Sequence, residues 1–180
     1  MDKDKLFKRL SKSLSKADAV KIALDKSCMP GDLISLSLYP HNEIAFRASW
    51  VLEQFLYCRW EDLISLIPEF ITGYLIQKNP SCQRHFTKIM MYLTEAGSQK
   101  EIKPLLNEYQ EQIIEITFDW LIDPQTPVAV QVNCMDILLH FGKEQAWINE
   151  ELRSQVQFML KDGSAAVQSR GKLILKKLKF

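Results

Sequence analysis

Apolar residues recur along the chain at the spacing of a helix. In residues 41–57, Ile44, Ala48, Val51, Leu52 and Phe55 are separated by 4, 3, 1 and 3 positions, which places them on one helical face. Alternating apolar and polar residues, the pattern of a strand, are scarce, and only 6 Gly and 7 Pro interrupt the 180 residues. The pattern predicts an all-α fold of about nine or ten helices.

This set of five positions, which we call the reference positions, returns three more times. The equivalents are Cys82, Phe86, Ile89, Met90 and Leu93, then Val130, Cys134, Ile137, Leu138 and Phe141, then Val167, Gly171, Ile174, Leu175 and Leu178. All are apolar except Gly171, which stands where Ala48 lets a neighbouring helix approach closely. Each copy is preceded by a turn and another helical segment. The sequence therefore predicts four hairpins, each with a first and a second helix.

Local signals place several helix boundaries. Ser15 is expected to cap a helix with Asp18 in its first turn, and Asp32 to cap the helix that follows the Pro30 turn. Pro68 is expected to bend or split the helical region of residues 60–77. The segment 98–101 fits a capping box for a long helix that ends near residue 122.

Two segments connect this repeat to a known family. IAFRA, which contains Arg47, and VQSRG, which contains Arg170, resemble the second helix of a HEAT repeat. Pro68 and Pro104 resemble the prolines common in the first helix of that family, whereas His85 and Asn133 stand where Arg is expected.

A HEAT-repeat protein is an α-α superhelix, or solenoid, and commonly binds other proteins. The resemblance implies a single domain over residues 1–180, with N-terminal capping helices in residues 1–29 and four HEAT-like repeats in residues 30–180. It implies no particular partner.

Charge is distributed unevenly. Residues 1–26 have a net charge of +4, residues 27–160 of −8 and residues 161–180 of +5. An acidic central region repels phosphate groups, and nucleic-acid binding depends on many Lys and Arg contacts. We therefore expect a protein or peptide partner and do not expect nucleic acid.

Candidate binding residues lie beside the reference positions on the second helices, which line the concave side of a solenoid. They are Trp50, Arg84, Lys88, Tyr92 and His140. Aromatic residues and Arg contribute much of the binding energy at protein interfaces. The hypothesis is a scaffold that binds a partner segment on its concave face. Trp50 either anchors that segment or packs against the next repeat. The other tryptophans, Trp60, Trp120 and Trp147, lie on first helices and are expected in the core.

Catalytic and cofactor motifs are not apparent. The three histidines lack metal-ligand spacing, and no Gly-rich phosphate loop occurs. We expect a protein that is not an enzyme and has neither cofactor nor metal. The alternative is an enzyme resembling HEAT-like alkylpurine DNA glycosylases, or another nucleic-acid-binding protein. For the enzyme, the nearest candidates are Asp136, Trp50, Arg47 and Arg84.

Location is inferred from what the chain lacks. No apolar run approaches the ~20 residues that span a bilayer, and residues 1–10 have no apolar segment typical of a secretory signal. The four cysteines are far apart and form no C-x-x-C motif. Reduced cysteines in a cytoplasmic protein are expected.

Overall fold

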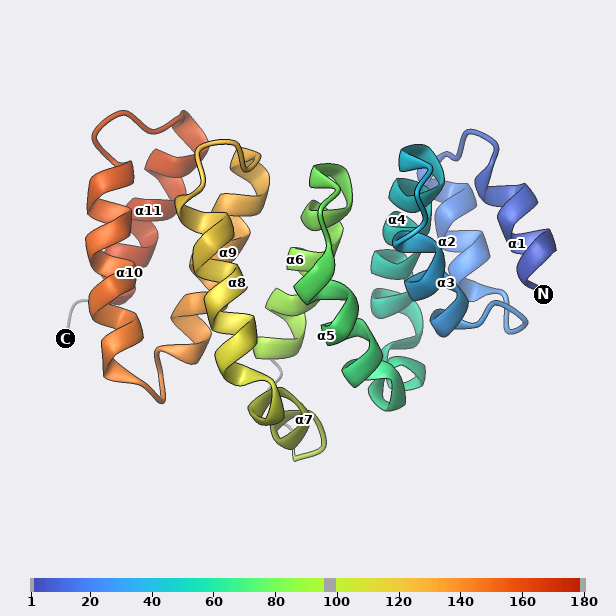
Figure 1. The fold of residues 1–180 in the computed structure, drawn as a ribbon, viewed down its shortest axis with the longest axis horizontal. Coiled ribbons are helices and arrows are strands. Elements are labelled where there is room, and N and C mark those ends of the chain that lie inside the picture. Colours follow the sequence, from blue (N-terminus) through green and yellow to red (C-terminus); the bar gives the residue numbers. More distant parts are fainter. Residues whose placement is uncertain (1, 96–99, 179–180) are drawn as a thin grey trace. The chain divides into compact units, whose positions relative to one another are not determined.

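The computed structural model describes residues 2–95 and 100–178, which form helices and no strand (Figure 1). In order, the elements are α1 (Lys3–Leu10), α2 (Lys16–Leu24), α3 (Pro30–Ser37), α4 (Asn42–Arg59), a 3-10 helix η1 (Trp60–Leu66), α5 (Ile67–Ile76), α6 (Pro80–Glu95), α7 (Ile102–Glu108), α8 (Gln110–Ile122), α9 (Val128–Phe141), α10 (Ala146–Met159) and α11 (Ala165–Lys177). The all-α prediction is confirmed.

Helix starts follow the local sequence in most places. At α2, the Ser15 hydroxyl accepts a hydrogen bond from the Asp18 N–H, and the Asp18 carboxylate accepts one from the Ser15 N–H. Pro68 separates η1 from α5, because its ring is tolerated only in the first turn of a helix. α3 starts earlier than expected, at Pro30, so Asp32 lies in its first turn and is not its cap.

The predicted long helix of residues 101–122 is interrupted. α7 ends at Glu108 and α8 begins at Gln110, with the backbone of Tyr109 outside helical geometry. Ser98, the cap predicted for this region, lies outside the described residues.

The chain divides into two compact units, residues 1–89 and 90–180, with the boundary inside α6. In the first unit, α2 and α3 pack against α4, and α5 packs against α3. The rings of Phe70 on α5 and Phe86 on α6 stack with centroids 5.1 Å apart. The prediction of a single domain over residues 1–180 stays a prediction.

In the second unit, α8, α10 and α11 all pack against α9, and α10 packs against α11. The last two helices approach closely at Gly171. A Cβ atom there would lie 3.1 Å from side-chain atoms of both Val156 and Leu160. Gly171 therefore provides the close approach that the small reference position predicted.

The reference positions form the core of both units. All of them are buried except Leu175, which is only half-buried. Leu175 lies on α11, and no described helix follows α11 to cover that side. The prediction that Leu175 is equivalent to the buried Leu52 and Leu138 is therefore wrong.

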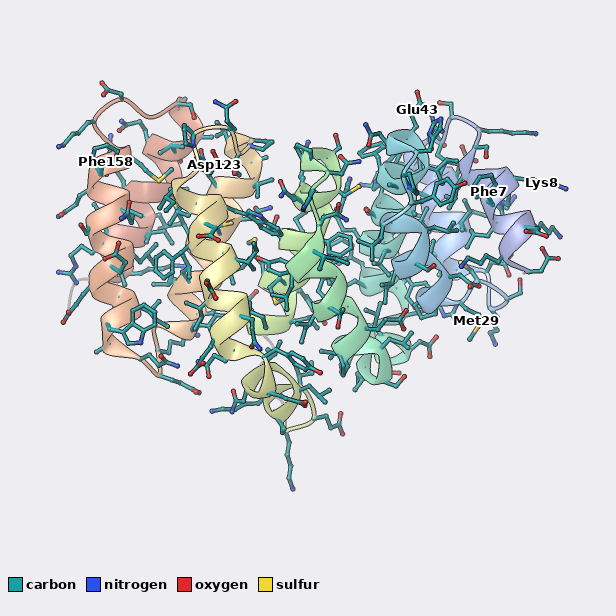
Figure 2. The ribbon with its side chains drawn as sticks, in the orientation of Figure 1. Phe7, Lys8, Met29, Glu43, Asp123 and Phe158 are labelled. Atoms are coloured by element: carbon teal, nitrogen blue, oxygen red, sulfur yellow. The ribbon has the colours of Figure 1, made fainter. Side chains whose placement is uncertain are left out.

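The tryptophans of the first helices differ in how deeply they are buried. Trp120 is buried, Trp60 is half-buried and Trp147 is 53% exposed, so the core assignment of Trp147 is wrong. The Trp147 ring stacks on Phe118 at the surface, with centroids 6.2 Å apart. Phe158, on the same helix, is also exposed (Figure 2).

Candidate protein-interaction surface

The five predicted binding residues all lie on second helices. Trp50 is on α4, Arg84 and Lys88 are on the part of α6 in the first unit, Tyr92 is on the part in the second unit, and His140 is on α9. Arg84 is exposed and the other four are half-buried. Each unit therefore presents its own part of the predicted surface.

Trp50 forms an aromatic pair with Phe46, one turn earlier on α4. The rings stack at 30° with centroids 6.1 Å apart, and Phe46 also lies 5.3 Å from the His85 ring of α6. Trp50 is half-buried, so it is neither a fully packed core residue nor a free anchor. The exposed part of its ring is available to a ligand.

Beside this pair lies a buried carboxylate that the repeat pattern did not predict. Glu53 is 4% exposed. Its carboxylate accepts hydrogen bonds from His85 Nδ1 at 2.5 Å, from Lys88 Nζ at 3.0 Å and from the Tyr57 hydroxyl at 3.4 Å. The sequence offered one signal, because His85 replaces the Arg of the family pattern and needs a polar neighbour when buried.

These contacts decide the charge of Glu53. Burial alone would raise its pKa, but the hydrogen bonds and positive charges of His85 and Lys88 outweigh burial, so the pKa of Glu53 is lowered. Glu53 is therefore ionised at neutral pH. It binds the Lys88 ammonium at 3.0 Å and the His85 ring, which itself lies 5.3 Å from Phe46.

The second unit contains a comparable buried carboxylate with fewer partners. Asp136 on α9 is 5% exposed, and its oxygens lie 3.2 and 3.0 Å from Nη1 of Arg170 on α11. Burial raises the pKa of Asp136, and the charges of Arg170 and Lys177 only partly offset this effect.

Three residues at one repeat position make the same kind of contact. Arg47 donates to the Leu10 carbonyl at 3.0 Å, His85 donates to Glu53, and Arg170 donates to Asp136. Each side chain reaches back to an earlier helix of its own unit, 32 to 37 residues upstream. The position of the family arginine therefore joins helices that are not adjacent in the chain, α4 to α1, α6 to α4 and α11 to α9, and His85 serves this role in place of Arg.

His140 is held by α6. Its Nδ1 lies 3.0 Å from the Thr94 hydroxyl, which also lies 2.9 Å from the Met90 carbonyl. Burial lowers the pKa of His140, and the nearby Lys143 and Lys177 lower it further against the effect of Glu95. His140 is mostly neutral at pH 7.

Two of the four residues named for the glycosylase alternative already pair with other groups of the protein. Asp136 pairs with Arg170, and Arg47 binds both the Leu10 carbonyl and Glu43. Within residues 2–95 and 100–178, no group of three His, Cys, Asp or Glu side chains is placed to hold a metal ion. No helix in those ranges is long and apolar enough to cross a membrane.

Helical hairpins with an equivalent buried face, whose second helices make polar contacts to earlier helices, are typical of an α-solenoid repeat protein. The HEAT repeat domain family matches residues 3–178, and the chain belongs to this family. HEAT repeats form helical scaffolds for interactions, and the family is generally non-catalytic.

Comparison with other proteins adds little to this assignment. Among curated proteins, none matches the chain significantly. Among solved structures, the crystal structure of an engineered protein is similar, with 14% identity over 99% of each chain and a TM-score of 0.49.

Proposed function

We propose that the protein is a non-catalytic scaffold that binds a segment of a partner protein on the concave face expected of a HEAT-repeat solenoid. The observation that carries the proposal is the half-buried Phe46–Trp50 pair on α4, together with the cations Lys88 and Arg84 on the part of α6 in the same unit. The rings stack at 6.1 Å, Lys88 is held by Glu53, and Arg84 is exposed. Aromatic and Arg side chains of this kind anchor partners at protein interfaces.

The residues proposed to contact the partner are those given by the repeat register: Trp50, Arg84, Lys88, Tyr92 and His140. No cofactor or metal is proposed. A cytoplasmic location is proposed on the four free cysteines, of which Cys28, Cys82 and Cys134 are buried, because free thiols persist in reducing compartments.

The test selects peptide ligands directly, so the natural partner need not be identified first. A phage-displayed random peptide library is selected on the intact chain, and the affinity of a selected peptide is measured by calorimetry. Trp50→Ala is expected to weaken binding by about 2 kcal/mol, or roughly thirtyfold. Arg84→Ala is expected to weaken binding without affecting the fold, because Arg84 is exposed.

A matched control is Trp147→Ala, which removes an exposed Trp from α10, a first helix. It should leave peptide affinity unchanged. Peptides that respond to Trp147→Ala but to neither Trp50→Ala nor Arg84→Ala would contradict the proposed surface. A fall in melting temperature of several degrees for Trp50→Ala, with unchanged affinity, would place Trp50 in the core.

The nucleic-acid alternative has no specific observation in its favour. It is tested by retention on a DNA resin at low salt, where phosphate contacts are strongest. We expect the chain to elute in the wash.

A further inference from the structure

A cleft in the second unit gathers three lysines from two parts of the chain. Lys143, in the turn after α9, and Lys176 and Lys177, at the end of α11, line a cleft of about 760 Å³ together with Leu139, His140 and Leu178. We call it the basic cleft. Within the described residues, none of these three lysines forms an ion pair with Asp or Glu.

The turn that carries Lys143 is fixed by close packing. Asn149 Nδ2 donates to the Gly142 carbonyl at 2.7 Å. A Cβ atom at Gly142 would lie 1.9 Å from Asn149 Oδ1, so any larger residue there would displace this amide. The position of Lys143 relative to α10 is thus set by the backbone and by Asn149.

The positive charge at the cleft comes from two separate parts of the chain, the turn after α9 and the end of α11. Lys143 and Lys177 both act on His140, and their charges lower its pKa. Because like charges gathered in this way repel one another, an anionic ligand that neutralises them gains favourable interactions at each lysine. The cleft is therefore complementary to negative charge.

Apolar lining identifies the kind of anion. Leu139 and Leu178 line the same cleft as the lysines, which suits a ligand with both carboxylates and aliphatic side chains. Glu95 also lines it and would repel a continuous row of phosphates. A peptide avoids this repulsion by placing a neutral residue there. We propose that the basic cleft binds an acidic, partly apolar segment of a partner protein.

The proposal deepens the proposed function at His140, on which it rests, by naming the chemistry of the partner there. It also couples binding to a proton. The groups that face His140 are Glu95 and Thr94 of α6, Lys103 of α7, Lys143 and Glu144 after α9, and Lys177 of α11. A bound carboxylate offsets Lys143 and Lys177, so protonation of His140 becomes easier and binding tightens as pH falls.

The experiment uses a fluorescein-labelled peptide of repeated Glu-Asp-Leu and its neutral counterpart of repeated Gln-Asn-Leu. Fluorescence anisotropy with the full chain at low salt is expected to show binding of the acidic peptide alone. The double variant Lys176→Gln/Lys177→Gln should weaken it by about tenfold or more. Lys143→Gln, outside α11, should also weaken binding of the acidic peptide. This variant replaces the double variant in the test if the double variant unfolds.

The matched control is Lys12→Gln/Lys16→Gln, which removes the same charge from exposed lysines of the first unit. It should leave the affinity unchanged. In NMR titrations, the pKa of His140 should rise when the acidic peptide is present.

Three results would overturn the proposal: no binding of the acidic peptide, equal loss with the control variant, or tighter binding of single-stranded oligothymidylate than of the peptide. Selected library peptides that depend on Trp50 and Arg84 would still support the proposed function in each case. The failure of the basic cleft is thus distinguishable from failure of the scaffold itself.

Discussion

Two buried carboxylates show how the number of partners decides the charge state of a residue. Glu53 and Asp136 are buried to nearly the same extent, at 4% and 5% exposure. Glu53 accepts bonds from three side chains and its pKa is lowered, whereas Asp136 has one cation within bonding distance and its pKa is raised. Similar burial therefore has opposite energetic consequences.

The first prediction follows from this contrast. Glu53→Gln should destabilise the fold by about 1–3 kcal/mol at pH 7, because buried donors lose a charged acceptor. Asp136→Asn should change stability by less than about 1 kcal/mol, or stabilise the fold, because it removes an ionised group whose burial is poorly compensated and leaves Arg170 partly hydrated. Urea unfolding of both variants measures the difference. Equal losses would contradict this account.

The second prediction concerns pH. The pKa of Glu53 in the folded state lies below its ordinary value of 4.5. Glu53 therefore stabilises the fold fully above that value, and this stability is lost as the pH falls through the lowered pKa. The contribution of Asp136 to stability depends on pH in the opposite direction. Because its pKa is raised, the folded state gains stability relative to the unfolded state as the carboxyl is protonated.

Urea unfolding at pH 7 and near pH 3 should therefore show a smaller acid-induced loss for Glu53→Gln than for the unmodified chain. Asp136→Asn should show a larger loss, because it removes the compensating protonation. A Glu53→Gln variant as acid-sensitive as the unmodified chain would rule out this role of Glu53.

At the scale of elements, the spacing of α10 and α11 depends on a single residue. Gly171 stands in the middle of α11, where glycine costs about 1 kcal/mol relative to Ala. It is nevertheless suited to this position because a Cβ atom would lie 3.1 Å from Val156 and from Leu160 of the neighbouring segment.

The third prediction tests this close approach. Gly171→Ala should be nearly neutral, because the gain in helix propensity offsets a contact that needs only a small adjustment. Gly171→Val should cost about 1–3 kcal/mol, since overpacking forces the two helices apart. Thermal unfolding followed by circular dichroism measures both variants. A valine variant as stable as the unmodified chain would show that the approach is not restrictive.

Much of the fold could be predicted from the sequence because it depends on local spacing. The reference positions predicted the core, and Ser15 and Pro68 predicted two helix boundaries. The burial predicted for Leu175 and Trp147 was wrong, because the exposure of these side chains depends on which helices cover them. A local sequence pattern does not contain that information.

The candidate surface was harder to predict for the same reason. The five residues proposed for it could be named from the repeat register, but the only sequence signal for the buried carboxylate of Glu53 was His85 in place of the family arginine. Position 53 lies beside Leu52 and Gln54 in a continuous buried segment of α4. From the pattern alone, a Glu at this position looks like an exception within a buried segment. Its ionised state becomes apparent only from its partners on α6, His85 and Lys88.

At the scale of the whole molecule, each unit has its own core around the reference positions. Leu52 lies in the unit of residues 1–89 and Leu138 in the unit of residues 90–180, and both are fully buried. In repeat proteins, stability is approximately a sum of the terms of each repeat and its nearest neighbours. The effect of a core substitution should therefore remain local.

The fourth prediction applies this to hydrogen exchange. Leu52→Ala and Leu138→Ala should each cost about 2–5 kcal/mol, the usual range for a buried Leu, whereas half-buried Leu175→Ala should cost less. In native-state amide exchange, Leu138→Ala should accelerate exchange in α8, α9, α10 and α11 and leave α2, α3 and α4 unchanged, because only the former pack around Leu138 within its unit. Leu52→Ala should give the reverse pattern. Uniform acceleration along the chain with either variant would show instead that residues 1–180 unfold as one cooperative domain.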